Sequence, residues 1–174
     1  GKVFIQLMHA GRMAHPDNTP HHRQPVAPSA VAPGQQMFTP TGMQDAPTPR
    51  ALTTEEIKAT VQDFRHAARR AIEAGAFVAV AHPAWSRYTI EDGRALSFAH
   101  AVEIYNHGCA IENDLGEGFY LLDQMLNEGH RLSAIATDDA HFKAPDYFGG
   151  WVHVKAESLD PEALLTALKA GQHY

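Results

Sequence analysis

An apolar run that directly follows a helix is the feature that most restricts the fold of this chain. The stretch "EAGAFVAVAHPAW", residues 73–85, ends a helix at Gly75 and then enters an unbroken apolar segment of strand length, 77–81. Such a strand is typical of a parallel sheet that is covered on both faces. The preceding helix is indicated by the capping-box spacing of Thr53 and Glu56 and by an apolar stripe at steps of four and three. The members of the stripe are Ile57, Val61, Phe64, Ala68 and Ile72.

The same alternation of strand and helix continues to the end of the chain. Strands are predicted at residues 3–7, 77–81, 101–106, 132–141 and 149–156, and further helices at 119–128 and 160–171. Strands that alternate with helices form right-handed βαβ units and a mostly parallel sheet. We therefore predict an α/β fold, a partial or distorted TIM-like (β/α) barrel of about five parallel strands where a complete barrel has eight. The prediction is a single domain over residues 1–174.

The composition excludes several classes of partner. A formal charge of -6 over 174 residues, without a cluster of Lys or Arg, argues against a nucleic-acid surface. Cys109 is the only cysteine, so no disulfide can form within the chain, as is usual for intracellular proteins. No apolar run reaches the ~20 residues that span a bilayer, so no membrane contact is expected. We expect a cytoplasmic protein that binds small molecules, metals or another protein.

Residues 11–51 are dense in proline and glycine and show no sustained period. They are predicted as one long loop. A loop of this length is either a functional lid or binding loop or a disordered segment, and the sequence leaves both interpretations open.

Polar side chains stand where the predicted strands end: His9, His82, Asn106, Asp138, Asp139 and His141. Ligands of parallel α/β sheets bind beyond the carboxyl ends of the strands, so we expect these side chains along one edge. Asp139 and His141 are two residues apart in an extended segment, so both can reach one ion. Carboxylate and imidazole together favour Zn²⁺, Mn²⁺ or Fe²⁺.

Each of these residues also has a purely structural interpretation. An Asp-Asp pair before a turn often forms an Asx-turn or a cap, and His82 can simply end a strand. Asn106 fits a turn. Glu103 alternates with its apolar neighbours, so it either supports the site from a barrel interior or is exposed. Three other histidines fit a solvated surface: His107, His130 and His153.

From about Ala76 to Tyr174 the chain resembles the C-terminal part of the polymerase and histidinol phosphatase (PHP) family. The segments that carry the resemblance are "FVAVAHPAWS", "AVEIYN", "AIATDDAHF", "FGGWVHVKA" and "LLTALKAGQHY". It implies a distorted (β/α)₇ barrel that holds two or three divalent metals and hydrolyses phosphoesters. The implied metal ligands are His82, Asp139 and His141, with Asp138 and His9 as weaker candidates.

The first half departs from the PHP pattern. That family requires a His-x-His strand, followed by an Asp, another His and a Glu, and these ligands are absent here. Three ligands leave a divalent ion with several waters, so we expect at most one weakly held ion and weak or no turnover.

Residues 1–75 resemble the Old Yellow Enzyme family of flavin-dependent ene-reductases. The segments are "VFIQLMHAGRMAHP", "PVAPSA", "TPRALTTEEI" and "FRHAARRAIEAG". The resemblance implies that Gln6 contacts a flavin ring, and that His82 takes the first of two substrate-binding positions, with Trp85 at the second. The loops that hold the flavin phosphate in that family have no counterpart in this sequence. FMN binding is therefore not expected.

Together the two resemblances predict a chimera of two barrels joined near residue 75, a product of design or recombination. The predicted function is a PHP-like metal-dependent phosphoesterase, in which a metal-bound hydroxide attacks a small phosphoester. The alternative is an engineered or recombinant (β/α) barrel without catalytic function. An open parallel sheet exposes two edges, so a homodimer that completes the barrel is also predicted.

Overall fold

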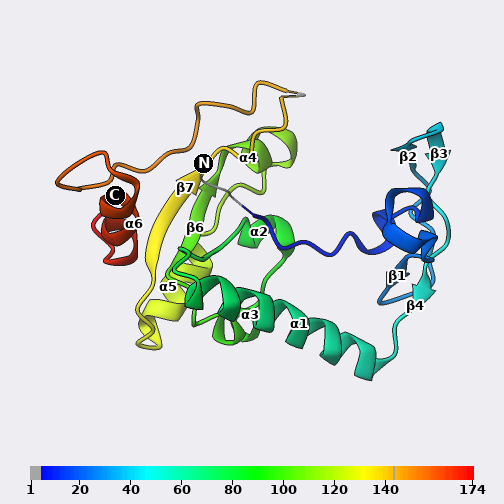
Figure 1. Cartoon of the computed structure of the whole chain (residues 1–174), viewed down its shortest axis with the longest axis horizontal. Helices are drawn as coiled ribbons and strands as arrows, with labels where there is room; N and C mark the ends of the chain where they lie inside the picture. Colours follow the sequence, from blue (N-terminus) through cyan, green and yellow to red (C-terminus); the bar gives the residue numbers. More distant parts are fainter. Residues whose placement is uncertain (1–4, 143) are drawn as a thin grey trace. The chain divides into compact units, whose positions relative to one another are not determined.

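The computed structural model describes residues 5–142 and 144–174 (Figure 1). The chain forms two compact units, one that ends at Ala67 and one from Ala68 to Tyr174. Within the described ranges, no helix is both long and apolar enough to cross a membrane. The predicted strand 3–7 lies partly outside the described residues, and residues 5–7 form no strand.

Residues 11–51 are not a single loop but a set of short elements. They are η1 (Gly11–Met13), η2 (Pro16–Asn18), η3 (Pro20–His22), β1 (Val26–Ala27), β2 (Gln36–Thr39), β3 (Gly42–Asp45) and β4 (Arg50–Ala51). β1 pairs in parallel with β4, and β2 forms an antiparallel hairpin with β3. The pairing of β1 with β4 therefore joins the middle of this segment to its C-terminal end.

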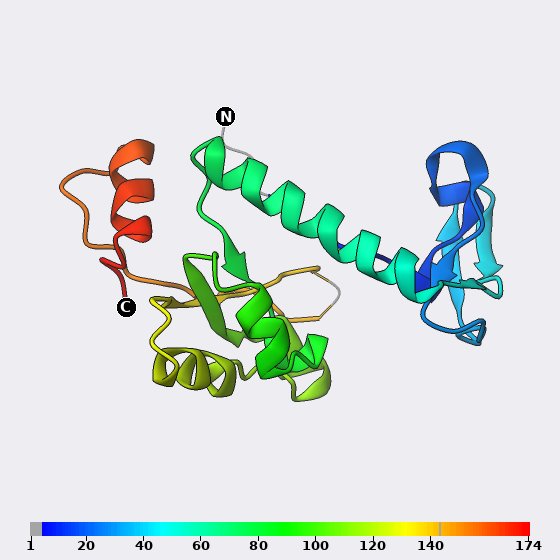
Figure 2. The same cartoon turned by 90° about the horizontal axis from the view of Figure 1, so that it is seen from below.

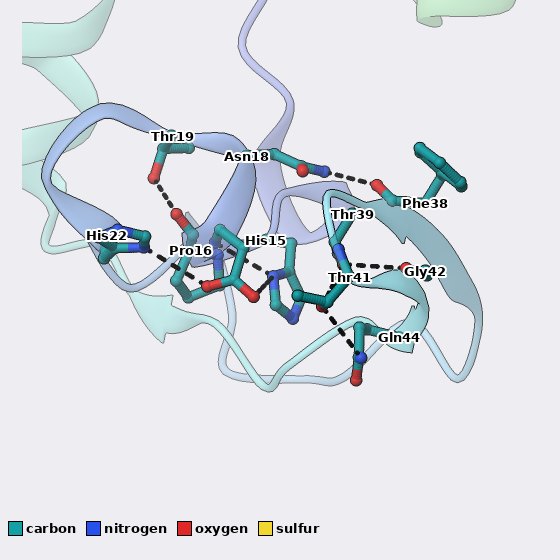
Figure 3. A network of polar contacts seen from close by, with 11 residues as sticks. His15, Pro16, Asn18, Thr19, His22, Phe38, Thr39, Thr41, Gly42 and Gln44 are labelled. Atoms are coloured by element: carbon teal, nitrogen blue, oxygen red, sulfur yellow. Dashed lines mark hydrogen bonds and ion pairs between the residues drawn. The ribbon is translucent and has the colours of Figure 1, made fainter.

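Side-chain hydrogen bonds order this segment (Figure 3). The Thr39 hydroxyl, which is buried, donates to the Gly42 carbonyl at 2.9 Å across the hairpin turn, and Gly42 has a φ of 108° that favours glycine. Asn18 Nδ2 donates to the Phe38 carbonyl at 2.8 Å and so connects η2 with β2. The Thr19 hydroxyl donates to the carbonyl of Pro16 at 3.0 Å. The segment is thus held by local polar contacts.

Helix α1 (Thr54–Glu73) has the start that the sequence predicts. The Glu56 carboxylate accepts from the Thr53 backbone N–H at 2.8 Å, and Thr53 Oγ1 accepts from the Glu56 N–H at 3.2 Å, which completes the capping box. Arg50 donates to both Glu56 oxygens at 2.9 Å. The hydrogen bonds from Arg50 are the main reason why the pKa of Glu56 falls to about 2.

The first unit buries only small side chains. Its buried residues, among those described, are Pro25, Ala27, Thr39, Ala46 and Pro49. Larger apolar side chains such as Phe38, Met43 and Val61 are exposed. Because burial of large apolar side chains is the main stabilising contribution to a fold, this unit has little core of its own.

The second unit contains the parallel sheet that the sequence predicts. Its strands are β5 (Ala79–Val80), β6 (Ala101–Asn106) and β7 (Ser133–Thr137), in the order β5-β6-β7 and all parallel. The α/β fold class with parallel strands is confirmed. β6 has the predicted bounds, whereas β5 and β7 are shorter than predicted. Residues 149–156 form no strand, only an isolated bridge between Val154 and His173.

Helix α5 (Phe119–Asn127) packs on β6 and provides much of the core of this unit (Figure 2). The other helices after α1 are α2 (Pro83–Ser86), α3 (Ile90–Ala95), α4 (His107–Asn113) and α6 (Pro161–Lys169). The buried cluster consists of Val80, Ala99, Val102, Leu121, Leu122 and Met125. A Cβ on Gly93 would lie 2.9 Å from Leu121 Cδ1, so the glycine allows α3 to pack closely on α5. The core of the second unit therefore lies between β5–β6 and α5.

Candidate functional site

The polar residues that follow the three parallel strands lie at one edge of the second unit. His82 follows β5, Asn106 is the last residue of β6, and Asp138 and Asp139 follow β7. Because the strands are parallel neighbours, their carboxyl ends meet, as the strand polarity predicts. Hydrogen bonds among these residues define a polar network.

Glu103 is the centre of the network. Its side chain is 3% exposed, and its carboxylate accepts from the His82 backbone N–H, from the Thr137 hydroxyl and from Asn106 Nδ2, the last at 3.1 Å. Of the two interpretations of Glu103, the structure therefore supports the one in which it faces the site. A β-bulge between Glu103 and Tyr105 interrupts the simple alternation of β6.

Asn106 is fully buried and connects two carboxylates. Its Oδ1 accepts from the Cys109 N–H at 2.8 Å and caps α4, while Nδ2 donates to Glu103 and, at 3.2 Å, to Asp139 Oδ2. A single side chain thus starts a helix and holds β6 to the residue after β7. Asn106 therefore both caps a helix and belongs to the polar network at the strand ends.

Two aspartates order the loop that follows β7. The Asp138 carboxylate accepts from the backbone N–H groups of Phe148, Gly149 and Gly150 at 2.7, 2.8 and 2.7 Å, and the bond from Gly150 contributes most to lowering its pKa. The buried Asp146 accepts from the N–H groups of His141 and Phe142, led by His141, and its pKa is lowered as well. Asp138 therefore anchors a loop, as the structural interpretation of the Asp-Asp pair allows.

The histidines that the sequence singled out have separate contacts. His82 is the N-cap residue of α2 and has a φ of 32°. Its Nδ1 lies 3.0 Å from Ser86 Oγ, and its ring contacts the ring of Trp85 edge-on. His141 Nδ1 lies 4.0 Å from Asp146 Oδ2. His9 belongs to the first unit, where its Nδ1 accepts from the Gly11 N–H at 3.1 Å.

No metal centre is formed by these residues. In the described part of the chain, no group of three or more His, Cys, Asp or Glu side chains is arranged to hold a metal ion. His82, Asp139 and His141 are therefore not gathered into the predicted ligand set, and Asp138 and His9 do not complete one. The carboxylates and His82 are engaged in hydrogen bonds within the fold instead.

Cys109 is buried next to the network and is not a nucleophile at neutral pH. Burial, and then the charges of Asp139 and Glu103, raise the pKa of its thiol to about 11. Since the thiolate is the reactive form, the Cys109 side chain acts as a small apolar group.

The first unit contains Gln6, the residue for which the Old Yellow Enzyme resemblance implies a contact with a flavin ring. Gln6 lies in the exposed segment 5–10. A hollow of about 190 Å³ is lined by Leu7, Met8, Asp63, Phe64 and Ala67. A second hollow, of about 180 Å³, is lined by His9, Pro28, Leu52, Ile57, Thr60 and Val61. Both are smaller than the roughly 300–1,000 Å³ of typical small-molecule sites, so neither encloses a cofactor by itself.

Residues 1–86 match the NADH:flavin oxidoreductase / NADH oxidase family. The first half of this chain is thus of the Old Yellow Enzyme type. The match passes through residue 75 and includes β5, His82 and α2. It therefore places α1 and the strand that follows it in the same family.

Curated relatives agree with this match. The chain is 44% identical to putative 12-oxophytodienoate reductase-like protein 1 of Arabidopsis thaliana over 79 residues, which are 43% of this chain and 22% of that protein. It is 41% identical to NADPH dehydrogenase of Bacillus velezensis over 83 residues, 48% of the chain and 20% of the relative. Putative 12-oxophytodienoate reductase 5 of Oryza sativa subsp. japonica is 33% identical over 136 residues, 76% of the chain and 34% of the relative. The chain spans about a third or less of the length of these relatives.

Among solved structures, an alanine mutant of morphinone reductase in complex with tetrahydroNAD is similar, with a TM-score of 0.35 and 33% identity over 59% of this chain and 23% of that one. Another structure of morphinone reductase covers 72% of the chain with a TM-score of 0.36 and 23% identity.

These findings overturn the predicted PHP phosphoesterase. The named relatives are reductases and a dehydrogenase, not hydrolases, and none belongs to the PHP family. The rice relative aligns with more of the chain than the 86 residues of the family match, so similarity to reductases extends into the second half. The predictions of a chimera joined near residue 75, of a metal-dependent hydrolase acting on a phosphoester, and of a divalent metal rather than FMN are therefore wrong.

The sequence left the central residue of the network undecided. A charged residue inside the apolar strand "AVEIYN" was a signal for Glu103, because a carboxylate in such a strand must find donors. Asp146 and Ser86 carried no comparable signal, since their partners are set by the loop and by α2.

Proposed function

We propose that the chain is a flavin-binding segment of an FMN-dependent oxidoreductase. The match of residues 1–86 to the NADH:flavin oxidoreductase / NADH oxidase family carries the proposal. When bound, FMN supplies the hydride-transfer chemistry of such an enzyme. Because the chain spans only part of its relatives, the reductase activity of a complete protein is part of the proposal.

Gln6 would hold the flavin ring. A carboxamide both donates and accepts hydrogen bonds, which suits the alternating donors and acceptors along the edge of a flavin ring. Gln6 lies in an exposed segment, next to the apolar side chains of Leu7 and Met8. This combination of one polar anchor with apolar neighbours fits the ring, but not the charged end of the cofactor.

The phosphate of FMN does not fit the polar network of the second unit. Glu103, Asp138 and Asp139 carry carboxylates there, and like charges repel a phosphate dianion. We propose that the phosphate is held by polypeptide that corresponds to other parts of the longer relatives. His82 would face the substrate, as the first of the two substrate-binding positions, with Trp85 at the second.

Gln6→Leu is expected to weaken FMN binding about tenfold, because loss of a hydrogen-bonding group from a ligand contact costs on the order of 1–2 kcal/mol. Fluorescence titration of FMN with the purified chain measures the dissociation constant. Gln62→Leu, a matched change on the exposed face of α1, should leave it unchanged. Equal affinities for the wild-type chain and Gln6→Leu, or no binding to the wild-type chain, would reject the proposal.

We further propose that the parallel strands are part of a TIM-like barrel, completed here by a homodimer. The edges of the sheet are β5 and β7, and the first unit buries no large side chain, so apolar surface is left for a second copy to cover. Light scattering is expected to give the mass of two chains. A mass of one chain at all concentrations would contradict the proposed homodimer.

A further inference from the structure

The backbone of His82 is fixed on both sides by hydrogen bonds. Its N–H donates to the buried carboxylate of Glu103, and its carbonyl accepts from the Ser86 N–H at 3.0 Å. His82 has a φ of 32°, in the left-handed region that residues with a side chain rarely adopt. Strained residues that are held by their surroundings are typical of functional sites. The place of the His82 backbone is therefore set by two elements, β6 and α2.

Helix α2 is itself held in place by its neighbours. The Tyr120 hydroxyl of α5 lies 3.1 Å from the Pro83 carbonyl oxygen and 2.7 Å from the Tyr88 carbonyl oxygen, so it can donate to either. A Cβ on Gly118 would lie 2.7 Å from Pro83 Cγ, so the glycine allows the chain before α5 to pass close to α2. A side chain carried by α2 therefore keeps its position within the second unit.

The imidazole of His82 is held by two residues of α2. Its Nδ1 lies 3.0 Å from Ser86 Oγ, one helical turn further along the chain, where side chains of the same helix face are neighbours. Its ring also contacts the Trp85 ring edge-on, with centroids 5.1 Å apart. His82 and Ser86 are both partly buried. The ring is thus oriented by a hydroxyl at Nδ1 and by an aromatic ring at its side.

The contact between Ser86 and Nδ1 also bears on the place of the ring proton. A neutral imidazole carries one proton, and the hydrogen bond that one nitrogen makes determines whether the other is a donor or an acceptor. Among the described residues, the His82 ring is the only hydrogen-bonding partner of the Ser86 hydroxyl. If Nδ1 carried the proton, the hydroxyl proton of this partly buried serine would have no acceptor there, which is unfavourable.

We propose that Ser86 is a positioning residue for His82. Its hydroxyl donates to Nδ1, which fixes the orientation of the ring and keeps the ring proton on Nε2. The consequence for catalysis rests on the proposed function, in which His82 faces the substrate. There Nε2 presents an N–H donor to an acceptor atom of the substrate and cannot take a proton from it.

NMR spectroscopy of the whole chain with isotope-labelled histidine tests this proposal. At about pH 8, where imidazole is neutral, a long-range proton–nitrogen correlation spectrum distinguishes the protonated ring nitrogen from the unprotonated one. His82→Gln identifies the signals of residue 82. The wild-type chain is expected to show one tautomer, with the proton on Nε2. The spectrum is recorded without flavin, so its outcome is separate from the FMN titration that tests the proposed function.

Three serine variants complete the experiment. Ser86→Ala is expected to let the His82 ring exchange between both tautomers, so that the separation of its two nitrogen shifts shrinks by roughly a third. Ser86→Thr keeps the hydroxyl and should give the wild-type spectrum. Ser97→Ala, which changes another partly buried serine of the second unit, should have no effect on the His82 signals.

Two results would overturn the proposal: a wild-type ring proton on Nδ1, or unchanged His82 signals in Ser86→Ala. Circular dichroism shows whether Ser86→Ala folds. If it does not, the wild-type chain and Ser86→Thr decide the question, because both must carry the ring proton of His82 on Nε2.

Discussion

Leu121→Ala is expected to lower the free energy of unfolding of the second unit by about 3–5 kcal/mol, the range for a fully buried leucine that leaves a cavity. Leu121 is 0% exposed and belongs to the cluster with Val102 and Met125. It also packs against the site of Gly93, so α3 and α5 would both lose contacts. Urea denaturation of the whole chain, followed by circular dichroism, measures the change.

Leu126→Ala provides the matched control. Leu126 lies on the same helix, α5, but is 47% exposed. Its replacement should change the free energy of unfolding by no more than about 0.5 kcal/mol, as is usual for surface positions. Equal effects of the two substitutions would mean that α5 does not pack on β6 as described.

Local signals were enough to predict α1 and β6. The capping box predicted the start of α1 within one residue, because Thr53 and Glu56 form both of its hydrogen bonds within one turn. The apolar run with a single charge placed β6 at its observed bounds. In α1 the deciding contacts lie close in sequence, and for β6 the apolar run itself indicated a buried strand.

Elements that depend on distant partners could not be predicted. β1 and β4 exist only because they pair with each other across the proline-rich segment. α2 begins directly after its N-cap residue His82, whose backbone N–H donates to Glu103 of β6. No periodicity within 11–51 or around residue 82 reports such pairing.

The edge on which the site lies follows from strand polarity, but the chemistry assigned to it does not. Parallel strands bring His82, Asn106 and Asp139 to one end of the sheet, and this much was predicted. The short segments "AHPAW" and "DDAH" also suggested metal ligands. In the structure these residues are held in hydrogen bonds, because the Asp139 carboxylate accepts from Asn106 and the His82 backbone N–H donates to Glu103. Strand polarity therefore predicted where these residues lie, but the short motifs did not predict their function.

Glu103→Ala is expected to cost about 3–5 kcal/mol of the free energy of unfolding of the second unit, because hydrogen bonds from three donors to a buried carboxylate are lost. These donors are the His82 N–H, the Thr137 hydroxyl and the Asn106 amide. The same denaturation experiment measures the loss. Glu112→Ala, an exposed glutamate of α4, is the control and should have little effect.

Glu103→Gln tests whether charge or hydrogen bonding holds the network together. Glutamine keeps one acceptor oxygen but presents an NH₂ group to at least one of the donors, so its effect should lie between those of the wild-type residue and alanine. If Glu103→Gln is as stable as the wild-type chain, one donor has another acceptor. If Glu103→Ala is also stable, Glu103 does not organise the carboxyl ends of β5, β6 and β7. The expected order, wild type above glutamine above alanine, follows because each step leaves more buried donors without an acceptor.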